Sequence, residues 1–144
     1  MQSTNMVFPR ALTLGVALMI TAVVSGCAAV APSKPEDVVR SRAQERVSLL
    51  QVRDFDKAYK YLPPSYRAIN SVDSYRNNFG AGAAWADPKV TRVDCSEGDR
   101  CIAEVQLGVK VVASGFGREP IPTTLREIWI QEEGQWWFQR YSNN

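Results

Sequence analysis

Histidine is absent from the 144 residues of this sequence. Its absence excludes Ser-His and Cys-His nucleophilic sites, histidine-ligated zinc sites and any His-Asp dyad. Charge is nearly balanced as well: the formal net charge is +2, and no basic block interleaved with aromatic residues occurs. Nucleic acid is therefore not an expected partner, and we expect no cofactor and no metal.

Charge is scarcest at the start of the chain, where Arg10 is the one charged residue among the first 26. An apolar run of 14 residues follows, from Ala11 to Val24, and small residues come after it. This pattern is typical of a secretory signal peptide. The run can be extended to Ala31, so an uncleaved membrane anchor is the alternative, since a spanning helix needs roughly 20 apolar residues.

The apolar run ends in the sequence Val24-Ser25-Gly26-Cys27. This tetrapeptide resembles the lipobox of bacterial lipoproteins, in which an aliphatic residue and two small residues precede the lipidated cysteine. The resemblance implies cleavage before Cys27 and three acyl chains on it, which is enough for stable anchoring. Ala28 stands where Asp would retain such a lipoprotein in the inner membrane, so we expect the outer membrane, with the protein facing the periplasm. The expected parts are a signal peptide over 1–26, a lipidated tether over 27–34 and a folded domain over 35–144.

Cysteine is also rare, and the two residues other than Cys27 lie close together in the sequence. Cys95 and Cys101 flank a short polar segment that contains a glycine, between two strand-like runs. In an oxidising envelope compartment this spacing predicts a disulfide across a β-hairpin. A metal site is the alternative, but it would lack further Cys or His ligands.

Helical periodicity dominates the first half of the expected domain. Ser33 and Glu36 fit a capping box, which predicts a helix that runs to about Arg53. Asp54 and Ser71 are suited to begin two shorter helices, over 55–62 and 72–79. The apolar face of the long helix contains Val39, Ala43, Val47 and Leu50. The charged residues assigned to its solvated face are Arg40, Arg42, Glu45, Arg46 and Arg53.

The periodicity changes to two after a flexible loop predicted over Gly80–Pro88. Strands are predicted over 89–95, 101–112, 123–131 and 135–141. In the second of these, the odd positions from Cys101 to Val111 are all apolar, which indicates one buried and one wet face. Helices followed by consecutive antiparallel strands predict an α+β fold, with N-terminal helices packed on one face of a sheet of about four strands.

Three segments carry a further resemblance: RDFDKAYKYLPPSYR after the long helix, YRNNFG at the end of the third helix, and the final hairpin EIWIQEEGQWWFQR. Over 36–141 this order resembles the NTF2-like superfamily of cone-shaped α+β domains. The resemblance implies a curved sheet that wraps three helices and leaves a cavity at its wide end. It also implies either an enzyme, such as a steroid isomerase or a dehydratase, or a binding, dimerising or accessory domain. The dehydratase type needs histidine, which this chain lacks.

Two kinds of residue are candidates for a site. Glu104 and Glu127 are the mid-strand carboxylates, and each either faces a cavity or faces solvent and pairs with a neighbour such as Lys110 or Arg126. Isomerase-type chemistry would need a buried carboxyl group with a raised pKa. Most of the many aromatic residues are assigned to the core. The candidates for a ligand or partner surface are Trp85, Trp129, Trp136, Trp137 and Tyr141.

The expected function is that of a non-catalytic lipoprotein, anchored through Cys27, whose domain binds an envelope protein, an apolar small ligand or a second copy of itself. Two alternatives remain. One is a small envelope enzyme with acid–base chemistry at Glu104 or Glu127, and the other is a structural subunit of an envelope complex. Strand geometry sends the adjacent Trp136 and Trp137 to opposite faces, so one of them is expected to lie outside the helix-facing core.

Overall fold

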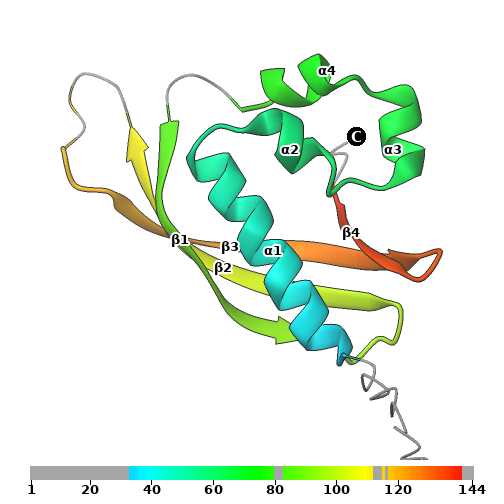
Figure 1. The fold of residues 1–144 in the computed structure, drawn as a ribbon. Coiled ribbons are helices and arrows are strands. Elements are labelled where there is room, and N and C mark those ends of the chain that lie inside the picture. Colours follow the sequence, from blue (N-terminus) through cyan, green and yellow to red (C-terminus); the bar gives the residue numbers. More distant parts are fainter. Residues whose placement is uncertain (1–32, 80–82, 112–114, 116, 141–144) are drawn as a thin grey trace, which may run out of the picture. The chain divides into compact units, whose positions relative to one another are not determined.

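The computed structural model describes residues 33–79, 83–111, 115 and 117–140. The expected signal peptide, Cys27 and Tyr141 lie outside the described residues. Within them, helices come first and strands follow (Figure 1). The helices are α1 (Pro35–Gln51), α2 (Phe55–Tyr59), α3 (Pro64–Ile69) and α4 (Val72–Asn77). The strands are β1 (Ala83–Asp94), β2 (Arg100–Val111), β3 (Ile121–Glu132) and β4 (Gln135–Gln139). The predicted α+β class is confirmed.

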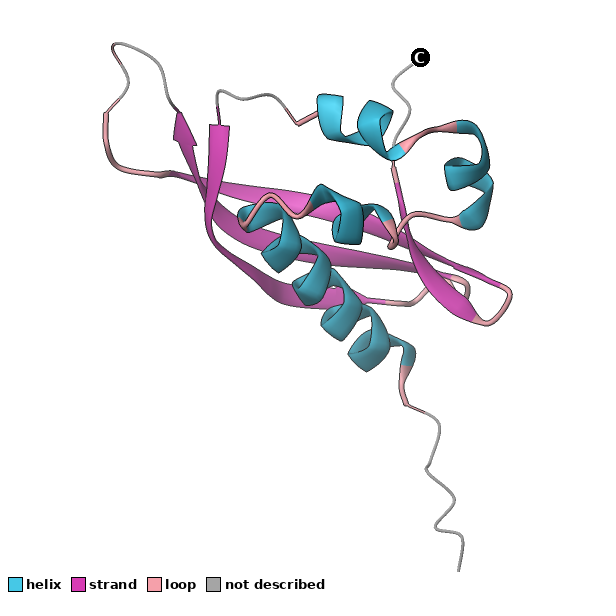
Figure 2. Ribbon diagram, turned by 45° about the horizontal axis from the view of Figure 1, so that its top comes forward, coloured by secondary structure: helices cyan, strands magenta, loops and turns pink. Residues whose placement is uncertain are grey.

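The strands form one antiparallel sheet in the order β1-β2-β3-β4, so each strand pairs with its neighbour in the sequence. Helix α1 lies across one face of this sheet, and the three short helices follow beyond its C-terminal end (Figures 1 and 2). The predicted alternation in β2 is confirmed, because Cys101, Ala103, Val105 and Leu107 are buried beneath the helices. The sheet therefore has one face that packs against α1.

Helix α1 buries the predicted apolar face, including Val39, Ala43 and Val47. The prediction that Ser33 is the N-cap of this helix is wrong. The N-cap residue is Lys34, and no side chain caps the helix. The reason is Pro35, which holds the residue before it in an extended conformation and is itself suited to the first helical position. The predicted N-caps of the two shorter helices are confirmed. Asp54 accepts a hydrogen bond from the Lys57 backbone N–H, and Ser71 accepts one from Ser74, each at 3.1 Å.

The loop predicted over Gly80–Pro88 is wrong for its described part, because β1 begins at Ala83 and places Trp85 opposite Val109. The Asp87-Pro88 pair is accommodated by a β-bulge, where the register between β1 and β2 shifts and Asp87 takes a φ of 47°. A bulge leaves its extra residue out of the ladder, so a proline can occur there without interrupting the strand.

A disulfide joins Cys95 and Cys101 across the turn between β1 and β2. At the same end of the sheet, Glu133 and Gly134 form the tight turn between β3 and β4, both with positive φ. This agrees with the predicted hairpin.

Apolar side chains pack in two clusters. One lies between α1 and the sheet and contains Trp129 and Trp136, and the other lies among α1, α2 and α4 and contains Phe55 and Tyr75. The half-buried Trp85 and Phe138 contact both clusters. Trp85 thus lies where the sheet meets the short helices.

Some backbone groups of the two edge strands, β1 and β4, form hydrogen bonds with residues outside the sheet. In the middle of β1, the Gln44 side chain donates to the Pro88 carbonyl and accepts from the Val90 N–H, each at 2.9 Å. On β4, the Phe138 N–H donates to the Tyr61 carbonyl at 2.8 Å. The Trp136 carbonyl accepts from Arg42 Nε, also at 2.8 Å. These contacts use backbone groups that an edge strand otherwise leaves open.

Candidate functional site: an aromatic pocket with one arginine

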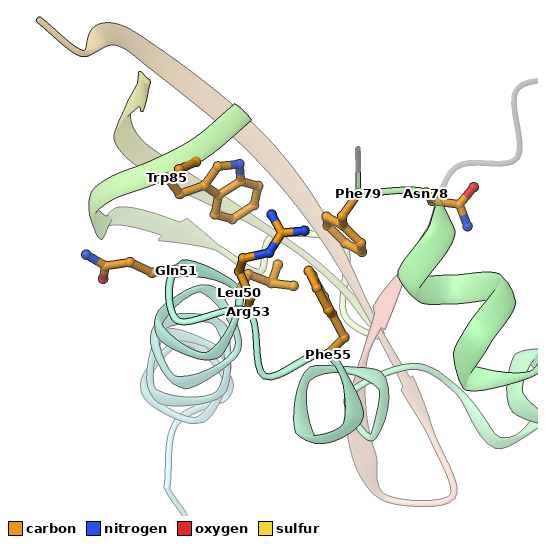
Figure 3. A pocket seen from close by; sticks show the side chains of 8 residues that line it. Leu50, Gln51, Arg53, Phe55, Asn78, Phe79 and Trp85 are labelled. Carbon is orange, nitrogen blue, oxygen red and sulfur yellow. The ribbon is translucent and has the colours of Figure 1, made fainter. Parts of the chain in front are cut away.

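A cavity of about 210 Å³ lies at the C-terminal end of α1. It is formed where the end of α1, the start of α2, the segment after α4 and the first residues of β1 meet (Figure 3). The lining residues are Leu50, Gln51, Arg53, Phe55, Asn78, Phe79, Ala84 and Trp85. Leu50 and Phe55 are buried, and Phe79 and Trp85 are half-buried. The wall is therefore mixed: five of the eight lining residues are apolar, three of these are aromatic, and the other three are polar or charged.

The aromatic wall is held in place by ring contacts. Phe55 stacks on Phe79 with ring centroids 5.1 Å apart, and Phe79 meets the buried Tyr75 edge to face at 5.0 Å. Such pairs stabilise by roughly 0.5–1.5 kcal/mol beyond the burial of their area. The pocket wall is therefore an extension of the second apolar cluster, with rings that are already packed.

Among the lining residues that the structure describes, Arg53 supplies the one formal charge. Its guanidinium carbon lies 5.1 Å from the centroid of the Phe55 ring, and Figure 3 shows the side chain extending toward the space between Trp85 and the two phenylalanines. Among the described residues, Arg53 forms no ion pair with an acidic side chain. A cation on an aromatic surface without a counter-ion is available to an anionic ligand.

Arg53 also has an unusual backbone conformation, with a φ of 59°. The Asp54 N–H donates to the Leu49 carbonyl and the Arg53 N–H donates to the Leu50 carbonyl, which is the Schellman pattern that ends many helices. Glycine is the usual residue at this left-handed position, and a residue with a side chain costs about 1–2 kcal/mol there. The chain therefore carries a strained arginine where a glycine would relieve the strain.

A second group of polar residues is buried beneath α1. Arg46 forms an ion pair with Glu127, and their side chains are only 4% and 5% exposed. Trp129 Nε1 donates to Glu127 at 3.2 Å, and Arg46 Nη2 donates to the Tyr75 hydroxyl at 3.4 Å. The guanidinium of Arg46 also lies 3.5 Å from the centroid of the Phe138 ring. The solvated face assigned to Arg46 is therefore wrong, and so is the alternative in which Glu127 faces solvent.

Burial raises the pKa of Glu127, whereas the Arg46 guanidinium and the Trp129 N–H oppose that rise. Burial also raises the pKa of the Tyr75 phenol. Neither Glu127 nor Arg46 lines the cavity at the end of α1. The other candidate, Glu104, is half-exposed and pairs in register with Arg92 on β1 and Arg126 on β3. Both carboxylates thus have cationic neighbours, and neither faces this pocket.

The residues proposed for a ligand or partner surface are distributed over different parts of the domain. Trp85 lines the pocket. Trp129 and Trp136 are buried in the core, so their assignment to a surface is wrong. Trp137 is half-buried, and its ring is contacted by the guanidinium groups of Arg42 and Arg67, each at 5.5 Å. The structure therefore leaves Trp85 at the pocket and Trp137 at a separate arginine-covered position.

The sequence pattern alone did not identify Arg53, Phe55 and Phe79 as pocket residues. Both phenylalanines fit the apolar faces of short helices, and Arg53 fits a charged helix end. One signal was available: Asp54 is a strong N-cap, so the long helix must end immediately before it, and the residue at that junction is Arg53 rather than glycine. In the described part of the chain, no group of three or more Cys, Asp or Glu side chains is arranged to hold a metal ion.

Comparisons with known proteins bear on the fold. No protein-family model and no curated protein matches the chain. Its structure is similar to the solution structure of a SEC-C motif containing protein from Rhodopseudomonas palustris. The match has a TM-score of 0.51 and 15% sequence identity, and covers 69% of this chain and 73% of the other. At this identity the similarity concerns the fold alone.

Proposed function

We propose that this protein is a non-catalytic lipoprotein of the bacterial outer membrane, facing the periplasm, whose NTF2-like domain binds a small apolar ligand in the pocket beside Trp85. The observation that carries the proposal is the aromatic cavity at one end of the helix layer, bounded by Phe55, Phe79 and Trp85. Ligand sites are usually concave and apolar, with a few polar groups that orient the ligand. The NTF2-like assignment rests on the order of elements and on this cavity beside the sheet.

The buried carboxylate supports a binding role over an enzymatic one. Glu127 is engaged by Arg46 and Trp129 and does not line the cavity, so it is not placed to exchange a proton with a ligand there. A general base must come within hydrogen-bond reach of the proton that it removes. Assembly of a structural subunit by strand addition needs free backbone groups on an edge strand. This alternative is disfavoured because several of these groups on β1 and β4 already form hydrogen bonds.

The anchor is proposed from the lipobox resemblance at Cys27. In the described part of the chain, no helix is long and apolar enough to cross a bilayer. In this proposal, the protein is attached to the membrane by the acyl chains on Cys27.

Replacing Cys27 with Ser is expected to abolish incorporation of labelled palmitate and to leave the unprocessed precursor. The measurement is labelling in the native bacterium, followed by gel mobility and membrane fractionation. The control is the Cys95→Ser, Cys101→Ser double variant, which should keep the label because only the disulfide is removed. Unchanged labelling of Cys27→Ser would refute the anchor.

Binding to the pocket is tested with indole as a neutral aromatic probe. The chain has four tryptophans, and two of them are buried in the core, so a titration followed by NMR should shift chiefly the Trp85 side-chain N–H signal. The Trp85→Phe variant assigns that signal. Trp85→Ala lacks the signal, so its affinity is measured by calorimetric titration, and the binding should be about ten-fold weaker through loss of ring contacts. If indole produces no shift at Trp85, the proposed binding function fails.

A further inference from the structure

We infer that the ligand of this pocket is a small aromatic monocarboxylate, bound with its ring against Trp85 and its carboxylate on Arg53. This inference rests on the proposed binding function and refines its ligand, which becomes an apolar ring that carries one carboxylate group. It is argued from the size of the cavity, the nature of its wall and the charge at Arg53.

Size limits the ligand first. The cavity of about 210 Å³ is smaller than the sites of roughly 300–1,000 Å³ that hold drug-sized molecules. A compound with one ring and a short substituent suits this space better than a steroid or a long acyl chain. The wall favours a ring because Trp85, Phe55 and Phe79 all present aromatic surfaces.

The positive charge of Arg53 favours a ligand that carries a carboxylate. The planar guanidinium of Arg53 matches the two oxygens of a carboxylate, and among the described lining residues no acidic side chain competes for it. Gln51 and Asn78 are the other polar residues of the wall, and each carries neutral amide donors. The nearest acidic residue in the sequence, Asp54, is already paired with Lys57 at 2.7 Å.

The end of α1 opposes an anion only weakly. Its partial negative charge is roughly half an elementary charge, which is less than the full charge of Arg53. The carbonyls of the last turn of α1 are also engaged in hydrogen bonds. Those of Ser48, Leu49 and Leu50 accept from the backbone N–H groups of Val52, Asp54 and Arg53, respectively. The pocket mouth therefore stays net positive.

The left-handed conformation of Arg53 is the independent observation. A strained residue that glycine could replace without strain is expected where the side chain itself has a role. The role assigned here is to place a fixed positive charge at the edge of an aromatic pocket. Arg53 is an exposed residue whose guanidinium lies on the Phe55 ring, so burial of its side chain does not account for the strain.

The test compares phenylacetate with phenylacetamide, which has the same ring and nearly the same shape but no charge. In the full-length protein we expect phenylacetate to bind about ten-fold more tightly, because hydrogen bonds to a charged group are stronger than those to a neutral one. The readout is the Trp85 side-chain signal in an NMR titration at low salt. Raising the salt concentration should narrow the difference between the two probes.

The Arg53→Gly variant should remove this preference and leave the binding of phenylacetamide unchanged. The variant relieves the left-handed strain, so it should fold at least as well as the wild type, which thermal denaturation verifies. The matched control is Arg92→Gln, a change of an exposed arginine on a strand position outside this pocket, which should keep the preference.

Equal affinity of the two probes in the wild type would overturn the inference, and so would a loss of both probes together in Arg53→Gly. If indole and phenylacetamide bind at Trp85 while phenylacetate gains nothing, the inference fails and the proposed binding function stands. If none of the probes shifts the Trp85 signal, both fail.

Discussion

Replacing Glu127 with Gln is expected to lower the free energy of unfolding by about 3–5 kcal/mol, because it leaves Arg46 as a buried cation without a counter-ion. The Arg46 side chain is only 4% exposed, so water cannot replace the lost carboxylate. Gln can still accept the Trp129 N–H, so the change removes mainly the charge. Urea denaturation at neutral pH, with far-ultraviolet circular dichroism as the signal, measures the loss.

The double variant Arg46→Met, Glu127→Gln is the control for this prediction. Removing both charges avoids the uncompensated cation, so the double variant should be more stable than Glu127→Gln alone. If the two single effects simply add, Arg46 and Glu127 are not coupled and the argument from the buried pair is wrong.

The Arg46→Met variant adds a dependence on pH. Burial raises the pKa of Glu127, and the variant removes the cation that opposes this rise. A carboxyl group with a raised folded-state pKa binds a proton more strongly when folded, so its variant gains stability as the pH falls toward the unfolded pKa and loses it as the pH rises. The deficit relative to the wild type should therefore be smaller at acid pH than at neutral pH.

Replacing Trp136 with Ala is expected to cost about 3–5 kcal/mol, since its side chain is buried between the sheet and the helices and its removal leaves a cavity. The Trp137→Ala variant is the matched comparison, because the two residues are adjacent on one strand. Trp137 is half-buried, and its removal takes away its contacts with Arg42 and Arg67 and the hydrogen bond that its Nε1 donates to the Glu132 carbonyl. The two arginine contacts contribute about 0.5–1 kcal/mol each, and the hydrogen bond about 0.5–1.5 kcal/mol.

Denaturation of both variants, together with their sedimentation behaviour, decides between packing and an interface. Equal destabilisation by the two changes would contradict the burial difference. A Trp137→Ala variant that keeps its stability but no longer self-associates would restore the earlier expectation that one of these tryptophans forms a partner surface.

Much of the fold follows from local patterns in the sequence. The alternation from Cys101 to Val111 places β2 with one face buried, and Asp54 and Ser71 begin helices as expected. The boundaries that failed have local causes. Because of Pro35, the N-cap of α1 is Lys34 rather than Ser33. The Asp87-Pro88 pair indicated a loop, but a β-bulge keeps both residues within β1.

The buried pair could not be predicted from the sequence pattern alone, because Arg46 and Glu127 are 81 residues apart. A partial signal exists: Arg46 lies three residues after Ala43 and four before Leu50, so it falls on the buried stripe of α1. Glu127 lies two residues before the buried Trp129, so the two side chains share one face of β3. What the sequence does not contain is the register that brings the two side chains together.

The bonds that Gln44, Arg42 and Tyr61 make to the outer strands bear on how the domain would behave when crowded. Acyl chains on Cys27 would confine many copies to a plane, where neighbours meet far more often than in bulk solution. Polymerisation into extended sheets requires an uninterrupted row of free amides and carbonyls on an outer strand. Here that row is interrupted on both edge strands by hydrogen bonds from α1 and from the segment after α2. A dense layer of this protein on a membrane should therefore stay as separate folded units rather than convert to fibrous aggregates.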